Sequence, residues 1–109
     1  MLNYTAMLKP HEIRVFRKEI AREDARLPIV FAALGEPRRC LIFRSLLAHK
    51  RLCVSDVARA FNISMSLASQ HLKILEVTKL VVREKEGRAS YFKANTADDI
   101  VRAIIKAVR

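Results

Sequence analysis

The sequence is poor in cysteine, glycine, proline and aromatic residues. Its 109 residues include two Cys, two Gly, three Pro and no Trp, and aromatic side chains make up 6%. Two cysteines cannot build the disulfide framework of a small secreted domain, so we expect a reducing, cytoplasmic compartment. No run of roughly 18 apolar residues occurs, so no membrane-spanning helix is expected. Residues 1–10 lack the basic-then-apolar order of a signal peptide.

Acidic residues are also scarce relative to basic ones. Lys and Arg number 21 against 11 Asp and Glu, a net charge of +10, while 51% of the residues are hydrophobic, enough for one folded domain. The excess lies in the middle: residues 36–61 carry six bases and two acids, and residues 62–95 carry six and three. Such a basic face suits nucleic-acid phosphates. A plain solvated surface is the alternative, and no segment has the paired basic and aromatic faces of a membrane-surface helix.

Two helices joined by a tight connection are predicted in the middle of the chain. Ser55 and Ser64 are expected to cap their N-termini, because a hydroxyl accepts hydrogen bonds from the first N–H groups of a helix. The second helix is expected from Met65 to about Val77. This spacing is typical of a helix-turn-helix.

The second of these helices has two distinct faces on a helical wheel. Met65, Ala68, Leu72 and Leu75 are predicted to face inward. The outward side has no acid before Glu76, which suits a DNA backbone, since hydroxyl, amide and ammonium groups bond phosphates and base edges. Its polar residues are Ser66, Ser69, Gln70 and Lys73.

A β-hairpin is predicted next, from the β-rich runs 80–82 and 90–92. Gly87 supplies the turn between them. Lys85 and Arg88 near its tip are expected to contact a minor groove or phosphates. The mixed charges of residues 83–88 also fit a solvated hairpin.

Amphipathic helices are predicted at both ends of the chain. One starts at Pro10 and the other at Thr96, which is expected to form a capping box with Asp99. Two more helical segments are expected between the first helix and the middle pair. One covers about residues 29–34 and ends at Gly35 in a left-handed cap, and the other starts at Pro37. The two terminal stripes either cover the chain's own core or meet a partner. They consist of Ile13, Phe16 and Ile20, and of Ile100, Ile104 and Val108.

Four segments, in order and with similar spacing, resemble the ArsR/SmtB family of winged-helix repressors. The resemblance runs from Phe31 to about Lys93. One departure is Lys79, where the family usually has glycine; it must hold a positive φ or end the helix differently. The matching segments are residues 33–39 (ALGEPRR), 52–58 (LCVSDVA), 66–75 (S-x-x-S-x-H-L-x-x-L) and 86–92 (EGRASYF).

The resemblance implies a mainly α fold with a small β-hairpin: five helices, two strands and a final helix. It also implies a homodimer, with residues 1–27 as an N-terminal dimerisation arm, 28–95 as the winged helix-turn-helix core and 96–109 as a C-terminal dimerisation helix. The partner is double-stranded DNA with a near-palindromic operator. DNA contacts are assigned to Ser64, Ser66, Ser69, Gln70, Lys73, Lys85 and Arg88, and the dimer interface to both apolar stripes.

The metal sites of this family are incomplete in the sequence. Cys53 matches the first cysteine of the family's C-V-C motif, but Ser55 stands at the second. A trigonal metalloid site needs three thiolates, and Cys40 is the only other cysteine. Asp98 and Asp99 are present for the C-terminal zinc site, but no histidine follows His71. We therefore predict no metal and no cofactor.

Cys53 and Cys40 remain candidates for a thiol sensor. N–H groups at the following helix start would favour a Cys53 thiolate, whereas Cys40 also reads as a small buried hydrophobe. A disulfide between them requires Cα atoms within about 7 Å. His71 is expected to pack or to bond backbone or phosphate, and His11 and His49 to be exposed.

The residues bear on three possible functions. The leading hypothesis is a homodimeric, sequence-specific DNA-binding repressor. The alternative is a winged-helix module that binds protein or RNA without an inducer. An enzyme is disfavoured because the sequence offers no nucleophile–base spacing.

Overall fold

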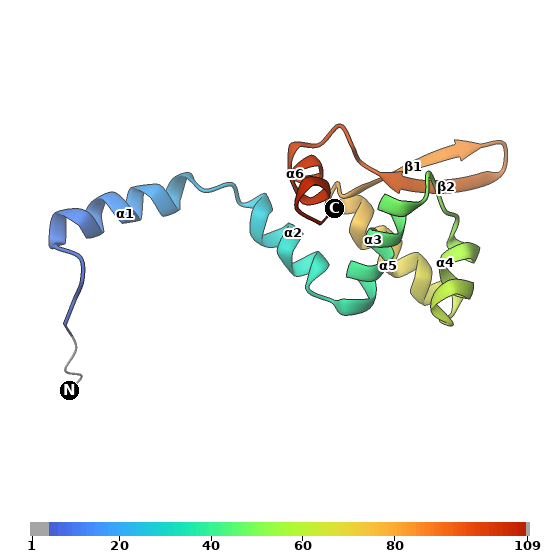
Figure 1. Cartoon of the computed structure of the whole chain (residues 1–109), viewed down its shortest axis with the longest axis horizontal. Helices are drawn as coiled ribbons and strands as arrows, with labels where there is room; N and C mark the ends of the chain where they lie inside the picture. Colours follow the sequence, from blue (N-terminus) through green and yellow to red (C-terminus); the bar gives the residue numbers. More distant parts are fainter. Residues whose placement is uncertain (1–4, 109) are drawn as a thin grey trace.

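The computed structural model describes residues 5–108, which form six helices and one hairpin (Figure 1). The predicted order of five helices, two strands and a final helix is confirmed. None of the helices in this range is long and apolar enough to cross a bilayer. The elements are α1 (Pro10–Arg22), α2 (Arg26–Leu34), α3 (Pro37–Ala48), α4 (Val54–Phe61), α5 (Met65–Val77), β1 (Val81–Glu86), β2 (Ala89–Ala94) and α6 (Asp99–Val108).

The core lies where α3, α5 and the hairpin meet. Ile42, Leu72 and Leu75 are fully buried there, and Phe92 is 2% exposed. The predicted inward face of α5 is therefore confirmed except at Met65, which is 55% exposed. Met65 is the first residue of α5, and because Cβ atoms tilt toward a helix N-terminus, its side chain points beyond the core.

The hairpin is antiparallel and confirms the predicted strands. Val81 pairs with Ala94 at its base and Glu86 with Ala89 at its tip, where Gly87 adopts a φ of 62°. An isolated β-bridge joins it: Leu52 donates to and accepts from Phe92, with N···O distances of 2.9 and 2.8 Å. This bridge fixes the start of α4 against the sheet.

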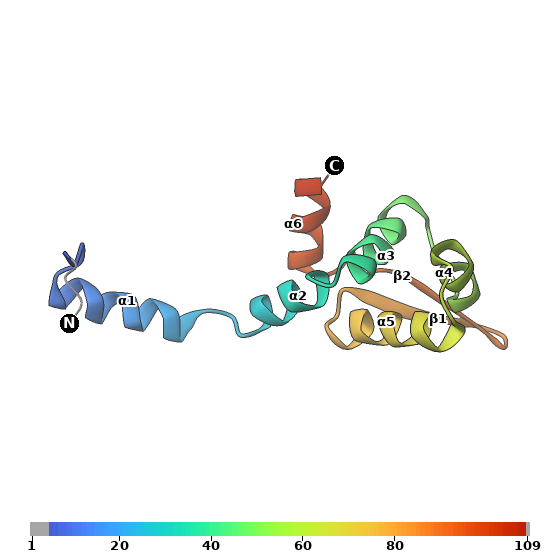
Figure 2. The same cartoon turned by 90° about the horizontal axis from the view of Figure 1, so that it is seen from below.

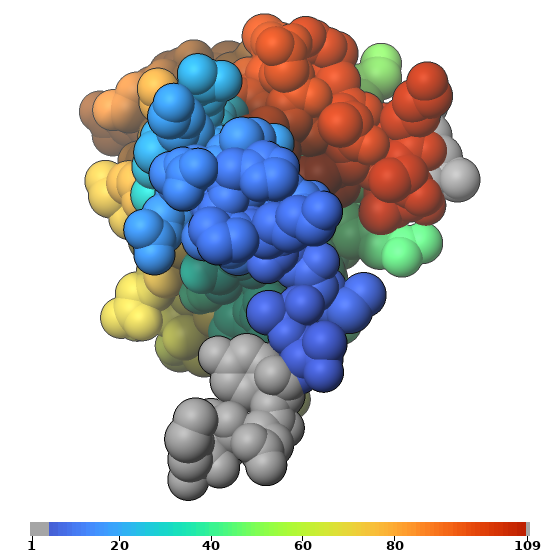
Figure 3. All heavy atoms as spheres, turned by 90° about the vertical axis from the view of Figure 1, so that its left-hand side faces the viewer, coloured from blue at the N-terminus to red at the C-terminus, as the bar shows by residue number. Residues whose placement is uncertain are grey.

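Helix α1 projects from the rest of the chain. All of its residues are exposed, and the molecule measures 60 × 31 × 24 Å (Figures 1 and 2). Its radius of gyration is 18.9 Å, against about 13 Å for a compact domain of this length. In the end-on view of Figure 3, α1 stands in front of the core, with α6 to one side. The stripe Ile13, Phe16 and Ile20, 37–58% exposed, therefore does not cover the core of its own protomer.

Two predicted helix starts are wrong, because at each observed start an aspartate carboxylate accepts a hydrogen bond from a backbone N–H. Helix α4 begins at Val54, not after Ser55, and Asp56 accepts a hydrogen bond from the Cys53 N–H at 2.9 Å. Helix α6 starts at Asp99, and the carboxylate of Asp98, not Thr96, accepts from the Val101 N–H at 3.1 Å. Asp caps helices better than Thr does. The predicted cap Ser64 is confirmed, since its Oγ accepts from the Leu67 N–H at 3.0 Å.

The predicted left-handed cap at Gly35 is also wrong. Its φ is −72°, in the right-handed region, because α3 starts only two residues later, at Pro37. A Cβ at Gly35 would lie 3.1 Å from the Phe31 carbonyl oxygen, so close backbone approach favours glycine here. Lys79, which follows α5, does adopt the left-handed conformation, with a φ of 63°, the first of the two alternatives considered for it.

Replacing Lys79 by Gly is expected to stabilise the protein by about 1 kcal/mol, because a non-glycine residue pays a steric cost in the left-handed region. The Lys79 carbonyl, which accepts hydrogen bonds from Arg26 and Asn95, is retained. Chemical denaturation measures the gain. Asn62→Gly, at a φ of 51°, is the matched control and should gain less, since Asn tolerates this region. No gain for Lys79→Gly would show that the strain is relieved elsewhere.

Candidate nucleic-acid interface

Helices α4 and α5 are held in a tight helix-turn-helix. Asn62 ends α4 in the left-handed conformation, and the Ile63 N–H donates to the Ala58 carbonyl at 3.0 Å. Ser64 then starts α5. Val57 and Ala58 of α4 are buried in the common core, so α5 has a fixed orientation relative to α4.

The flank of α5 that faces away from the core is exposed at all the predicted polar positions. A groove of about 440 Å³ lies beside it, lined by Ser69, Gln70 and Lys73 together with Ile74 and Arg83. The structure thus brings together residues of the recognition flank and a strand residue of the hairpin. The predicted residues Ser64, Ser66, Ser69, Gln70 and Lys73 are exposed.

Arg83 and Ile74 are groove residues that the sequence reasoning missed. The Arg83 guanidinium lies 3.1 Å from the Glu76 carboxylate and 5.0 Å from the centre of the Phe92 ring. It therefore links β1 to α5. The sequence pattern that could have identified Arg83 is the strand period of two, which puts Arg83 on the same face of β1 as the predicted DNA contact Lys85.

The acids of the hairpin are paired with cations, while its predicted DNA contacts are not. Glu84 pairs with Lys93 and Glu86 with Arg51, both at 2.5 Å. The Lys93 ammonium lowers the pKa of the Glu84 carboxyl. Within residues 5–108, Lys85 and Arg88 take part in none of the ion pairs and are exposed near the tip. The tip therefore presents positive charge.

His71 is buried on the inner side of α5, which confirms the expected packed position; His11 and His49 are exposed. The Nδ1 atom of His71 has no hydrogen-bond partner among the described residues and lies 3.9 Å from the carboxylate of Glu36. Glu36 caps α3 by accepting from the Arg39 N–H at 2.7 Å. Burial lowers the pKa of His71, and the negative charge of Glu36 only partly opposes this. His71 is therefore neutral near pH 7.

Acidification is expected to destabilise the protein through His71. Because burial lowers its folded-state pKa, the unfolded chain binds a proton at higher pH than the folded chain, so the free energy of unfolding falls as pH drops below about 6.5. Urea denaturation between pH ~7 and ~5.5 measures this, a range in which carboxylates remain ionised. His71→Phe should flatten the profile, with circular dichroism as the folding check. Coincident slopes for the two proteins would contradict this assignment.

The two cysteines are free thiols and both are partly buried. The Cys53 thiol donates to the Asp56 carboxylate at 3.1 Å, and the hydrogen bonds from Cys53 lower the pKa of Asp56. Cys53 is the N-cap residue of α4, so it lies at the helix N–H groups as expected, and its thiol also contacts a carboxylate. Between residues 5 and 108, no three His, Cys, Asp or Glu side chains lie close enough to share a metal ion.

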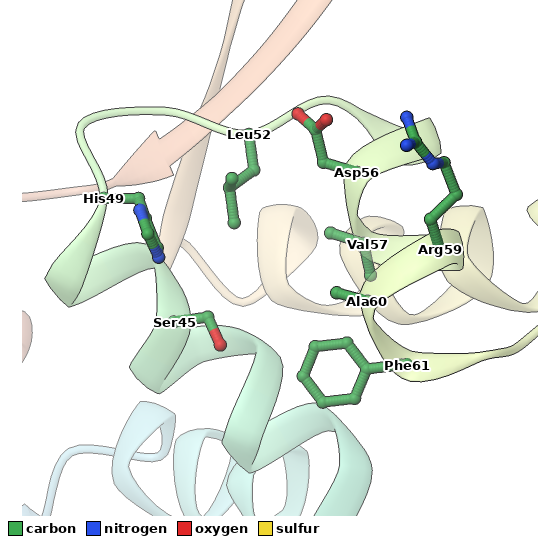
Figure 4. A pocket seen from close by; sticks show the side chains of 8 residues that line it. All are labelled: Ser45, His49, Leu52, Asp56, Val57, Arg59, Ala60 and Phe61. Carbon is green, nitrogen blue, oxygen red and sulfur yellow. The ribbon is translucent and has the colours of Figure 1, made fainter.

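A second hollow, of about 620 Å³, lies between α3 and α4 (Figure 4). Leu52, Val57 and Phe61 point into it, whereas Arg59 points away. Two of its polar groups already bond within the protein: the Ser45 hydroxyl donates to the Leu41 carbonyl at 2.8 Å and Asp56 accepts from Cys53. We assign no ligand to it.

A helix-turn-helix with an acid-free exposed flank, followed by a hairpin with a cationic tip, defines a winged helix-turn-helix DNA-binding protein. The sequence model of the bacterial regulatory proteins of the arsR family matches residues 36–81. The chain is also 38% identical over 99 residues to the transcriptional repressor SmtB homolog of Synechocystis, covering 89% of this chain and 73% of that protein. It therefore belongs to the ArsR/SmtB family of transcriptional repressors and is a regulator, not an enzyme.

Further comparisons agree with this family. The arsenical resistance operon repressor of Bacillus subtilis is 35% identical over 65 residues, which cover 60% of this chain and 62% of that protein. The structure of reduced HlyU from Vibrio cholerae matches with a TM-score of 0.71 at 26% identity, over 84% of this chain and 93% of that one. A winged helix-turn-helix domain from Mycobacterium bovis matches with a TM-score of 0.66 at 21% identity, over 95% and 86% of the two chains, and supports the fold.

Proposed function

We propose that this protein is a homodimeric repressor that binds a near-palindromic operator through α5. The exposed flank of α5 carries the proposal, since it presents hydroxyl, amide and ammonium groups beside the groove of Arg83 and has no acid before Glu76. A two-fold dimer would place two such helices in successive major grooves, roughly 34 Å apart.

Each exposed side chain has a distinct part in this proposal. Gln70 reads an adenine edge, and Ser66 and Ser69 bond bases or phosphates. Lys73 contacts phosphate, as does Ser64 at the start of α5. Lys85 and Arg88 hold the flanking backbone from the hairpin tip. Because Arg83 lines the groove beside α5, we include it among the residues that contact phosphate.

The dimer is proposed to form through α1 and α6. The apolar stripe of α1 is exposed in the protomer, and Val108 of α6 is 40% exposed, while Ile100 and Ile104 also pack against the core. The similar Mycobacterium bovis domain is described as homodimeric. We therefore assign residues 1–27 and 96–109 to dimerisation and 28–95 to DNA binding. The boundary after residue 27 falls inside α2, which begins at Arg26.

We further propose that this repressor does not respond to metals through the thiolate site. Three thiolates are needed for a trigonal metalloid site, and the Cys53 thiol is engaged by Asp56. Ser55 supplies no thiolate. Zinc, cadmium and arsenite should accordingly leave DNA affinity unchanged, and release of DNA by any of them would refute this part.

Selection of duplexes from a random-sequence library tests the function. The wild-type protein should enrich a near-palindrome, and its affinity should fall steeply with salt, because counterions are released from each contacted phosphate. Binding that is insensitive to salt, or that prefers single strands, would support the alternative of a protein- or RNA-binding module. Sedimentation of the free protein should show a dimer.

A further inference from the structure

Arg26, the first residue of α2, connects three elements that are distant in sequence. Its guanidinium donates to the Thr78 carbonyl at 3.1 Å and to the Lys79 carbonyl at 3.4 Å, at the end of α5. The same group forms an ion pair with Asp98 at 2.5 Å. Both side chains are largely buried, with exposures of 25% and 13%.

The charges in this junction alternate in sign from one group to the next. Carbonyls at a helix C-terminus carry partial negative charge, and N–H groups at a helix N-terminus carry partial positive charge. Arg26 meets the C-terminus of α5, and Asp98 accepts from the Val101 N–H at the N-terminus of α6. The C-terminus of α5 therefore attracts the Arg26 cation, the cation attracts the Asp98 carboxylate, and the carboxylate attracts the N-terminus of α6.

The junction lies between the two functional ends of the molecule. Along the long axis, α1 occupies one end, α2 and α6 lie near the middle, and α4 and the hairpin tip occupy the other end (Figures 1 and 2). Arg26 also follows the connection to α1, where its own N–H donates to Asp24 at 2.9 Å. Asn95, which leads from β2 toward α6, donates to the same Lys79 carbonyl at 3.0 Å.

We propose that the Arg26–Asp98 pair is a positioning element that sets the orientation of α5 relative to α1 and α6. In the dimer this orientation fixes the distance and phase of the two recognition helices, so the pair determines which half-site spacing the repressor accepts. This inference rests on the proposed function, because it requires a dimer on a two-part operator. Neither residue touches DNA, so both act through α5.

The test compares Arg26→Gln and Asp98→Asn with wild type on the duplex that wild type selects. Half-site spacing is varied in single-base-pair steps, and a duplex with one half-site is included. Asp98→Asn keeps the cap of α6, since Asn caps as well as Asp, and keeps the protein folded should Arg26→Gln not fold. The matched control is Asp99→Asn, which removes the exposed partner of Arg102 instead.

Wild type should show one sharp spacing optimum. Both junction variants should lose about tenfold affinity at that optimum and show a flattened spacing profile, with single-half-site affinity and dimerisation unchanged. Asp99→Asn should match wild type. An unchanged spacing profile in the junction variants overturns the inference but leaves the proposed function intact. An equal loss of affinity on the single half-site also overturns it, because the pair would then only support the structure of each subunit. Failure of wild type to select any duplex overturns the proposed function itself.

Discussion

Gln70→Ala is expected to reduce the discrimination between operator and unrelated duplex by roughly 10- to 100-fold, since a bidentate contact to a base is worth about 1–3 kcal/mol. The Gln70 side chain is exposed on the groove beside α5, so truncating it leaves the core intact. Binding to unrelated DNA should change little. Competition titrations with specific and unrelated duplexes measure the ratio.

Lys73→Ala should behave differently at the same flank. It is expected to weaken all duplexes by a similar factor and to reduce the slope of log affinity against log salt by about one, the share of one phosphate contact. Lys18→Ala, an exposed cation on α1, is the control and should leave the slope unchanged. If Gln70→Ala and Lys73→Ala both bind like wild type, α5 is not the recognition helix.

Phe16→Glu is expected to dissociate the dimer and to lower affinity for the full operator by about 100-fold or more. An unpaired carboxylate buried in an interface costs several kcal/mol. Phe16 is 47% exposed in the protomer and buries nothing in the core, so the protomer should keep its helix content. Sedimentation and operator titration measure the two effects.

Val15→Glu provides the matched control for this prediction. Val15 is also exposed on α1, at 54%, but lies away from the stripe of Ile13, Phe16 and Ile20 on the helical wheel. It should dimerise and bind the operator as wild type does. A dimeric Phe16→Glu protein, or a monomeric Val15→Glu protein, would place the interface on another face.

Much of the recognition region was predictable because its signals are local. The period of 3.6 residues placed Ala68, Leu72 and Leu75 inward, and the hydroxyl of Ser64 marked the start of α5. Met65 was misplaced because the wheel treats a terminal residue like an interior one. The caps at Cys53 and Asp98 were missed because several nearby polar residues compete for each helix start, and hydrogen-bond geometry selects among them.

The Arg26 junction lay beyond such reasoning. Its partners Thr78 and Asp98 are 52 and 72 residues away in sequence, and no periodicity reports a contact at that separation. The groove position of Arg83 depended in the same way on how the hairpin packs beside α5. Likewise, the pairing of the hairpin acids, which leaves Lys85 and Arg88 unpaired among residues 5–108, required the register of the two strands and the position of Arg51.

By itself, the sequence determined the order of elements, the inner and outer faces of α5, the hairpin and its turn at Gly87, because side-chain period, capping chemistry and glycine freedom act within a few residues. The tertiary structure alone decided that α1 leaves its apolar stripe uncovered, that Arg83 lines the groove beside α5, and that Arg26 joins the end of α5 to the start of α6. These features depend on the packing of distant segments, where burial and charge pairing select one arrangement among many that the local pattern permits.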